Sequence, residues 1–510
     1  MKYIIGLDIG TSGAKCILID TNGTVVASAT KGYPLYTPRP GWAEQDPEDW
    51  WQAVVEGLKD ILSTAEIDAA DIVGVGFSGQ MHGLVALDEN DQVIRPSILW
   101  CDQRTQKQCD WITEQAGGRE ALLAYTNNPM LTGYTGGKIL WLREVEPENF
   151  ARMKSFLCPK DYIRFRMTGK KLMDVSDASG TSLFDTRNRV WATELITKVA
   201  GLDMSIFPDV VESTAYAGAV TEEVAALTGL PAGLACYAGG GDAVVQATGS
   251  GLVQPGILGV VIGTSGNVSM GINHYEDNPN GDLQMYCANE PGAWIAIGGT
   301  LSAGGSYRWY RDTLCENAQK EAKETNANIY DVMGKQAEAS VPGAHGVVFA
   351  PYLTGERCPY PDANARGCFY GLSLTTTRAD MTRAVMEGIT FSLNQIIEIF
   401  RNFADNTKIY ASGGGAASKF WRQIQADVFQ LPVYTMSAAS EGGAYGAALI
   451  AGTGAGLWKN LTEATSVLKE ETLVEPSAVI PEGYAKSYSI YKQLYPSLKP
   501  VYDQGAEFGY

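Results

Sequence analysis

Two short turns that combine glycine with hydroxyl side chains lie half a chain apart. Gly6–Gly13 (GLDIGTSG) and Gly259–Gly266 (GVVIGTSG) share six of eight residues, and the equivalent residues Gly10 and Gly263 are 253 positions apart. Glycine lets the backbone approach an anion closely, and successive N–H groups with Thr and Ser hydroxyls can surround a phosphate. A single turn of this kind is more often an ordinary hairpin turn. Two copies between apolar strands indicate a duplicated fold, whose halves each present a phosphate-binding turn to a shared cleft.

The two copies differ at a position that matters for metal binding. Asp8 ends the first predicted strand, whereas its counterpart in the second copy is Val261. Mg²⁺ takes one or two carboxylates together with water and phosphate oxygens, so Asp8 beside a phosphate turn is a candidate magnesium residue. The alternative is that Asp8 only caps the turn through a side-chain hydrogen bond. Lys15 would add a cation near the same turn.

A triple glycine followed by an acid is the sharpest local signal in the chain. Residues Ala238–Val245 read AGGGDAVV, and the glycines would allow a substrate or another strand to approach closely. Asp242 then begins a stretch of helical character, so one reading is a helix N-cap. Our interpretation is a general base, because a carboxylate at a cleft can accept the proton of a sugar hydroxyl that attacks a γ-phosphoryl group.

One of only three histidines follows another predicted strand. Phe77–Gly83 (FSGQMHG) contains His82, and no nearby His or Cys has metal-ligand spacing. A hydrogen bond to a sugar and a structural role therefore both stay open for His82. The overlapping Gly74–Gly79 formally matches GxGxxG, but residues 84–87 read as a strand where a dinucleotide fingerprint requires a helix. A nicotinamide-dependent oxidoreductase has no other support.

A third glycine turn lies late in the chain. Ser412–Ser418 (SGGGAAS) stands between a predicted strand at 408–411 and a predicted helix at 419–430. Such a turn can press its backbone against a base or a phosphate, although any tight strand-to-helix loop could look like this. The P-loop sequence GxxxxGK[ST] is absent from the chain.

The elements that must position these residues follow from the apolar pattern. Three strands are predicted first, at residues 2–8, 14–20 and 24–30. A helix that Asp46 caps and Pro47 opens comes next, followed by a strand at 72–77. The order βββαβ differs from the simple alternation of a doubly wound sheet. Residues 442–458 are uncharged and rich in Gly and Ala, which predicts a tightly packed buried helix rather than a membrane span.

The composition limits the class of protein. A chain of 510 residues with 45% hydrophobic and 19% charged residues is typical of a globular protein of about two to four domains. The net charge of −18 would repel phosphodiester backbones, so we expect no nucleic-acid partner. Nine cysteines without a CxxC pair predict reduced thiols in a cytoplasmic protein. The apolar run of Met1–Asp8 is too short for a signal peptide, and no membrane partner is expected.

Together these motifs resemble the FGGY carbohydrate kinases of the actin/hexokinase/Hsp70-like superfamily. The resemblance extends over nearly the whole chain. Within it, Gln80–Gly83 (QMHG) favours the branch that acts on xylulose over those that act on glycerol, gluconate or ribulose. The other motifs that carry the resemblance are Asp8–Gly13, Ile98–Trp100, Pro159–Tyr162, Ser176–Ala178, Gly239–Asp242, Gly263–Gly266, Leu353–Arg357 and Gly413–Ala416.

The resemblance implies an α/β fold of two RNase H-like domains around a central cleft. We expect an N-terminal domain at 1–246 with the sugar site, a C-terminal domain at 247–457 with the second phosphate turn and the adenosine site, and a helical appendage at 458–510. The implied reaction transfers a phosphoryl group from Mg-ATP to the 5-hydroxyl of D-xylulose. A kinase of the same family for ribulose, gluconate or glycerol is the main alternative, ahead of an actin/Hsp70-like ATPase without a sugar. Dimers are common in the family, which makes a homodimer an expectation here.

The resemblance also implies roles for individual residues. Asp242 would be the proton acceptor, Met81 and His82 would contact the sugar, and Asp8 would lie near Mg²⁺. Family members that act on xylulose often carry an amide residue directly after the catalytic acid, where this chain has Ala243. That departure bears on which sugar is bound rather than on the chemistry. The residues implied to bind ATP are Thr11, Ser12, Gly13, Lys15, Gly263, Thr264, Gly304, Gly414 and Ser418.

Overall fold

The predicted N-terminal hairpins form the centre of a sheet in the computed structural model, which describes residues 1–278, 280–437 and 441–508. β1 (Tyr3–Ile9) pairs antiparallel with β2 (Gly13–Asp20), and β2 pairs with β3 (Val25–Gly32). β5 (Ile72–Gly79) lies parallel to β1 on its other side. The sheet has the order β13-β14-β5-β1-β2-β3, with β15 also paired to β5. The added strands are β13 (Tyr216–Ala219), β14 (Ala235–Tyr237) and β15 (Gly240–Gly241).

A long amphipathic helix covers one face of this sheet. α1 (Pro47–Thr64) begins where Asp46 accepts a hydrogen bond from the backbone N–H of Glu48 at 2.9 Å. Its buried side chains, among them Trp50 and Leu58, pack in one core with Leu7 and other alternate residues of the strands. Burial of such large apolar side chains contributes about 1.5–3 kcal/mol each. The order of β1, β2, β3, α1 and β5 is the one predicted.

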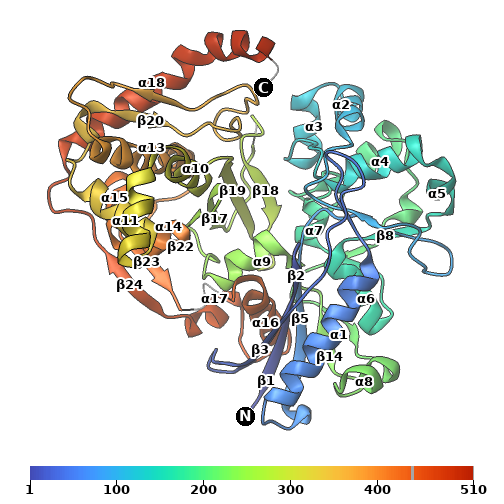
Figure 1. Cartoon of the computed structure of the whole chain (residues 1–510). Coiled ribbons are helices and arrows are strands. Elements are labelled where there is room, and N and C mark those ends of the chain that lie inside the picture. Colours follow the sequence, from blue (N-terminus) through green and yellow to red (C-terminus); the bar gives the residue numbers. More distant parts are fainter. Residues whose placement is uncertain (279, 438–440, 509–510) are drawn as a thin grey trace. The chain divides into compact units, whose positions relative to one another are not determined.

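The predicted small-residue helix packs on the opposite face of the same sheet. α16 (Gly442–Gly454) lies beside β1 and β5, and its alanines share a core with Ile4, whose side chain points away from α1 (Figure 1). A Cβ at Gly6 would lie 1.9 Å from the carbonyl oxygen of Ala444, and one at Gly76 would lie 1.9 Å from that of Ala447. The helix and the strands are therefore in backbone contact, which at Gly6 and Gly76 only glycine permits.

The second copy of the turn joins a second hairpin of the same kind. β16 (Ile257–Ile262) pairs antiparallel with β17 (Gly266–Ile272), and β22 (Lys408–Gly413) lies parallel to β16. This repeats the arrangement of β1, β2 and β5, as the sequence duplication predicts. The sheet has the order β18-β19-β17-β16-β22-β23-β24. The remaining strands are β18 (Gln284–Cys287), β19 (Trp294–Thr300), β23 (Val433–Met436) and β24 (Glu470–Val474).

Helices of two groups carry residues that matter below. Those in the compact unit that contains the first sheet are α4 (Thr135–Val145), α6 (Pro159–Thr168), α7 (Val175–Ser179) and α9 (Asp242–Gly249). Those in the unit that contains β16 and β22 are α10 (Gly304–Leu314), α12 (Ile329–Glu338), α13 (Arg378–Phe400), α14 (Gly414–Ala417), α15 (Lys419–Phe429) and α18 (Glu482–Gly505).

The chain divides into two compact units that interleave in sequence. The first unit contains Met1–Gln254, Gly271–Ala296 and Ala438–Lys469, and the second contains Pro255–Met270, Ile297–Ser437 and Glu470–Tyr510. Because these units follow spatial contacts rather than chain order, the contiguous domains at 1–246 and 247–457 stay a prediction. The C-terminal segment 458–510, whose last two residues lie outside the described part, is not helical throughout. It also supplies β24, because the backbone of Glu470–Val474 pairs with β23, a partner that the local sequence does not reveal.

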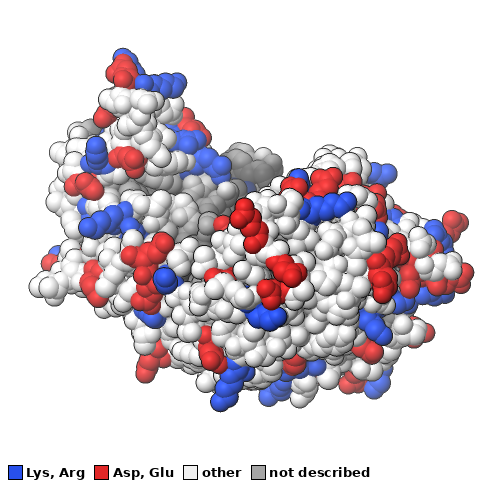
Figure 2. Space-filling model, turned by 90° about the horizontal axis from the view of Figure 1, so that it is seen from below, with Lys and Arg blue, Asp and Glu red and all other residues white. Residues whose placement is uncertain are grey.

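The surface charge is mixed rather than gathered by sign. Figure 2 shows Lys and Arg interspersed with Asp and Glu on the face in view, with no continuous basic region among its described residues. Within the described ranges, every helix is either too short or too polar to cross a membrane.

Candidate active site

Three parallel strand ends meet in the first unit where the predicted acids lie. Asp8 on β1 is paired in register with Ser78 on β5, and Ser78 with Gly240 on β15. The Ser78 hydroxyl donates a hydrogen bond to Asp8 Oδ1 at 2.8 Å. In α/β sheets, ligands bind beyond the carboxyl ends of parallel strands. The predicted chemistry therefore falls at the edge of the sheet where such a site is expected.

The triple glycine leads the chain from this sheet edge into α9. A Cβ at Gly239, whose φ is +75°, would lie 2.0 Å from the carbonyl oxygen of Phe77. The glycines could admit either a substrate or a neighbouring strand, and at Gly239 the close neighbour is the strand. Gly241 is the N-cap of α9, so Asp242 is the first helical residue and not the cap. The backbone N–H of Ala243 donates to Asp242 Oδ1 at 2.8 Å.

The two acids share one electrostatic environment. Burial raises the pKa of Asp8, against the lowering effects of the Ser78 hydrogen bond and the Lys15 charge. Burial and the nearby charge of Asp8 raise the pKa of Asp242 to about 7, against backbone hydrogen bonds from Ala243 and Met81. Both residues are only partly buried, so each keeps some exposure to solvent. A carboxyl with a pKa near neutrality is suited to accept a proton from a substrate.

The first phosphate turn is held by neighbouring loops. The Gly10 N–H donates to the Gly13 carbonyl at 3.1 Å, which closes the turn. The indole N–H of Trp100 donates to Thr11 Oγ1 at 2.9 Å, a contact that sequence reasoning did not find. Lys15 is paired in register with Asp8, and its Nζ forms an ion pair with Glu441 at 2.8 Å. Phosphate binding by Thr11, Ser12, Gly13 and Lys15 stays a prediction.

The two predicted sugar residues lie beside the segment that carries Asp242. Met81 is buried, and a Cβ at Gly241 would lie 2.4 Å from Met81 Cγ. His82 has a left-handed backbone with φ +69°, and its Nδ1 is hydrogen-bonded to the carbonyl oxygen of Gly180 at 2.6 Å. Its ring stacks on Tyr134 with centroids 4.4 Å apart. The structure thus brings Met81, His82 and the candidate base together within one unit.

A buried lysine on α4 holds the backbone of His82. Lys138 Nζ donates to the carbonyl oxygens of His82 and Gly133, each at 2.7 Å, and the Thr135 hydroxyl donates to the His82 carbonyl at 3.0 Å. Burial lowers the pKa of Lys138 to about 7, although the charge of Asp102 opposes this. Sequence reasoning missed Lys138, because a lysine in a helix normally reads as solvent-exposed.

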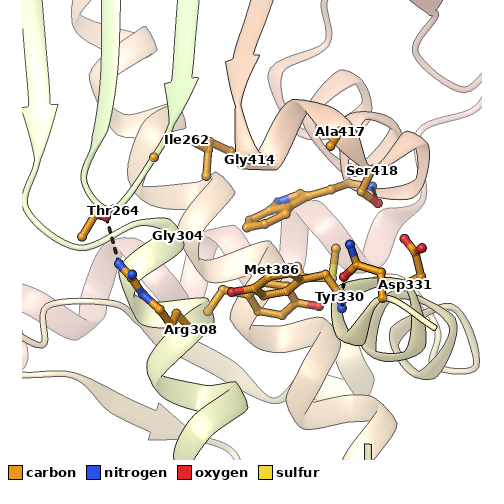
Figure 3. Close-up of a pocket in the computed structure, with 15 residues that line it drawn as sticks. Ile262, Thr264, Gly304, Arg308, Tyr330, Asp331, Met386, Gly414, Ala417 and Ser418 are labelled. Atoms are coloured by element: carbon orange, nitrogen blue, oxygen red, sulfur yellow. Dashed lines mark hydrogen bonds between the residues drawn. The ribbon is translucent and has the colours of Figure 1, made fainter. Parts of the chain in front are cut away.

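The second phosphate turn opens onto a cavity of about 390 Å³ within the second unit. Figure 3 shows Gly414 and Ser418 on one wall and Met386 and Tyr330 on the other. This volume lies in the range of small-molecule sites. The lining includes all five residues of this unit that were predicted to bind ATP, namely Gly263, Thr264, Gly304, Gly414 and Ser418.

The turn and the start of α10 are packed together. A Cβ at Gly304 would lie 2.4 Å from the Gly263 carbonyl oxygen, and the Gly305 N–H donates to the Thr264 carbonyl at 2.9 Å. Arg308, one helical turn after Gly304, donates to Thr264 Oγ1 at 2.9 Å (Figure 3). A guanidinium, a helix N-terminus and a glycine turn all favour a bound anion. The spacing of four residues from Gly304 could have identified Arg308 in the sequence.

Aromatic residues that no local motif reveals complete the cavity. Ser418 caps α15 by accepting a hydrogen bond from the Trp421 N–H at 3.2 Å, which brings the Trp421 indole to the wall. The Tyr307 ring lies 5.2 Å from the Trp421 ring, centroid to centroid. Flat apolar walls with a few polar groups are typical of small-molecule sites. The lining residues that sequence reasoning missed are Tyr307, Arg308, Asn328, Tyr330, Asp331, Met386 and Trp421.

Comparison with known proteins finds a family model for each half of the chain. Residues 3–249 match the model of the N-terminal domain of the FGGY family of carbohydrate kinases, and residues 258–455 match that of its C-terminal domain. The chain belongs to the FGGY family of carbohydrate kinases. The resemblance inferred from the motifs is confirmed, and this FGGY protein is an ATP-dependent carbohydrate kinase.

Named relatives of this FGGY kinase act on different sugars. The xylulose kinase of Bacillus subtilis is 38% identical over 503 residues, which cover 98% of each chain. The gluconokinase of the same organism is 32% identical over 85% of this chain and 84% of its own. The crystal structure of the xylulose kinase from Rhodospirillum rubrum superposes with a TM-score of 0.91 at 30% identity, over 98% of this chain and 100% of that one. The two-domain α/β fold is thereby confirmed.

Proposed function

We propose that this kinase transfers the γ-phosphoryl group of ATP to the 5-hydroxyl of D-xylulose, with Asp242 as the general base. The observation that carries the proposal is the place of the Asp242 carboxyl, which accepts a hydrogen bond from the Met81 backbone and lies near the charge of Asp8. There its pKa is raised to about 7. The xylulose kinases among the relatives support the choice of sugar. Within the family resemblance, the motif Gln80–Gly83 also favours xylulose.

The proposed step moves one proton and one phosphoryl group. Asp242 accepts the proton of the sugar 5-hydroxyl while the oxygen forms a bond to the γ-phosphorus. The bond from the γ-phosphorus to the bridging oxygen breaks, and ADP leaves with that electron pair. General-base catalysis of this kind contributes about 10²- to 10⁴-fold to the rate. Positioning and charge neutralisation by the phosphate turns would contribute the rest.

The nucleotide would divide its contacts among the residues described above. The cavity of the second unit would receive the adenosine between the Gly414 wall and Tyr330. Gly263 and Thr264 would meet the phosphates of the same nucleotide, and the hydroxyls and N–H groups of the first turn would do so as well. Arg308 would add a positive charge at Thr264.

The donor chemistry of Asp8 fits Mg²⁺. Its Oδ1 accepts the Ser78 hydrogen bond, which leaves Oδ2 outside that contact, and burial makes an isolated negative charge there costly. Asp8 would hold the metal directly or through water. Bound there, Mg²⁺ supplies positive charge that neutralises the phosphate oxygens.

A panel of acceptors tests the proposal. ADP formation is measured by a coupled assay with D-xylulose, D-ribulose, D-gluconate, glycerol and no sugar. We expect kcat/KM to be highest with D-xylulose and ADP formation without sugar to be slow. A preference for gluconate would assign the chain to the activity of its gluconokinase relative, and Ala243 would then be the first residue to examine. Turnover that no sugar stimulates would indicate an ATPase.

A further inference from the structure

A fully buried cluster of charged residues lies next to residues 238–242, the segment that carries Asp242. Lys160 Nζ lies 2.5 Å from an oxygen of Asp161, 2.9 Å from one of Asp174 and 3.1 Å from one of Asp177. Arg164 donates to the same Asp161 oxygen at 2.7 Å. We call these five residues the buried charge cluster. All five side chains are excluded from solvent, so none of them can contact substrate in this arrangement.

The charges of the cluster come close to cancelling. Burial would raise the pKa of Asp174, but Lys160 and the hydrogen bonds of Ser176 lower it below its usual range. Burial, together with the charges of Asp161 and Asp174, raises the pKa of Asp177 despite Lys160. Two cations thus face three carboxyl groups, and the raised pKa of Asp177 favours its neutral form. Although Cys158, Asp161 and Asp177 are close enough to share a metal ion, the Lys160 ammonium already bonds to both acids.

The cluster is hydrogen-bonded to the backbone at Ala238, directly before the triple glycine, and through Ser176 at Gly241, its last residue. The guanidinium of Arg164 donates to the Ala238 carbonyl at 2.9 Å. At the other end, the Gly241 N–H donates to Ser176 Oγ at 2.9 Å, and that hydroxyl donates to Asp174 Oδ2 at 2.7 Å. Each bond reaches a charged group that cannot move without disrupting the other ion pairs of the cluster.

Side chains pack directly against the backbone of this segment and restrict its conformation. A Cβ at Gly240 would lie 2.8 Å from Ser176 Oγ and 2.3 Å from Asn289 Nδ2, so the backbone rests directly on these side chains. Asn289 in turn donates to Ser213 Oγ at 3.0 Å, and Ser213 donates to Asp174 Oδ2 at 3.0 Å. The contacts on this side of the segment thus converge on Asp174.

We propose that the buried charge cluster positions the general base, and that Ser176 is the residue through which it acts. The proposal rests on the proposed role of Asp242. In this proposal, Asp174 orients the Ser176 hydroxyl, and that hydroxyl holds the Gly241 N–H in place. The position of Gly241 then sets the orientation of Asp242, the next residue. Ser176 and Asp174 are positioning residues and touch no reacting atom. A misplacement of about 1 Å in a reacting group can cost about 10²-fold in rate.

The test is a kinetic comparison of two serines on the same short helix. Ser176→Ala removes the bond to Gly241, whereas Ser179→Ala removes a buried hydroxyl whose hydrogen bonds go to Val175 and Cys287 instead. We expect Ser176→Ala to lower kcat about 10- to 100-fold with the KM values for sugar and ATP within about twofold of the wild type. Ser179→Ala should keep kcat within about twofold at a similar loss of Tm, and Ser176→Thr, which retains the hydroxyl, should restore kcat.

A double-mutant cycle separates this inference from the proposed function. In an Asp242→Asn background, Ser176→Ala should cause no further loss of kcat, because the group it positions is already gone. An equal kcat for Ser176→Ala and Ser179→Ala, or a loss that persists in that background, would overturn the inference. If Asp242→Asn alone kept the wild-type kcat, Asp242 would not be the general base, and the proposed function would be wrong in that respect. If Ser176→Ala does not fold, Ser176→Cys replaces it, with an expected loss of about 10-fold, and an unchanged kcat would count against the inference.

Discussion

The pKa of Asp242 depends on a neighbour as well as on burial. The charge of Asp8 adds to the effect of desolvation, so the proton affinity of the base responds to whatever neutralises Asp8. Ser78 and Lys15 already offset part of the charge of Asp8. A cation bound at Asp8 would lower the pKa of Asp242 and favour its ionised, proton-accepting form.

The pH profile of the wild type tests this at the level of one residue. Because a protonated Asp242 cannot accept the substrate proton, kcat/KM for the sugar should fall as the pH decreases below about 7 and approach a tenfold loss per pH unit. The residual rate of Asp242→Ala, expected to be about 10²- to 10⁴-fold lower, should lack this acidic limb. If the Asp242→Ala rate still fell at acidic pH, another group would be responsible for that fall. Unchanged nucleotide binding by the variant would show that its fold is intact.

Asp8→Asn tests the metal role of the other acid. The amide is a weaker ligand than the carboxylate, so the Mg²⁺ concentration for half-maximal activity should rise at least about tenfold, and chelation should abolish the activity of both forms reversibly. Asp46→Asn is the matched control, because Asn caps a helix as well as Asp and this residue caps α1. Equal Mg²⁺ requirements in the wild type and Asp8→Asn would exclude Asp8 as a metal residue.

At the level of elements, the approach of two strands demands a glycine before the base. Gly239→Ala would place a Cβ 2.0 Å from the Phe77 carbonyl oxygen and would also strain a positive φ. Gly233→Ala is the matched control, since Gly233 has φ +80° with no atom within 4 Å of its added Cβ. We expect about 1–2 kcal/mol of destabilisation in the control and at least about 1–3 kcal/mol more at Gly239, measured by urea unfolding. Equal losses would mean that the strand contact is not limiting.

Single elements were predictable where one local signal defined them. Asp46 and Pro47 mark the start of α1, and the uncharged small residues of 442–458 predicted α16 because such a surface permits backbone contact. β24 was not predictable, because its strand character depends on pairing with β23 rather than on its own charged sequence. The predicted site residues lie in short motifs that combine glycine with hydroxyl, acidic or basic residues, or in the segment Gln80–Gly83. Lys138 and the aromatic residues of the cavity carry no such motif.

At the scale of the whole molecule, the buried Lys138 makes stability depend on pH. Its pKa is lowered to about 7 in the folded protein, whereas an unfolded lysine titrates near 10.4. Between these values the unfolded chain binds the proton and the folded chain does not, so this residue makes stability rise with pH from about 7 to about 10. Below about pH 7 both states are protonated and its contribution is constant.

Lys138→Met isolates this contribution. Its Tm, compared with that of the wild type from pH 7 to pH 10, should rise less steeply with pH, because the proton-linked difference at residue 138 is gone. The KM for the sugar should also increase, since the carbonyl of His82 loses a donor. Parallel Tm curves for the two proteins would contradict a neutral buried lysine.

The sequence by itself determined the family, and it located the two candidate phosphate turns and the acid at the start of α9, because each depends on residue types at short spacing. Only the tertiary structure showed that Gly239 lies against a neighbouring strand, and that Lys138 and Ser176 donate or accept hydrogen bonds that hold backbone near the candidate site. It also showed that Trp421 and Tyr330 line a cavity together with the second turn. These relations join segments tens to hundreds of residues apart. The side chains involved come into contact only when the core packs, and no local sequence pattern predicts such contacts.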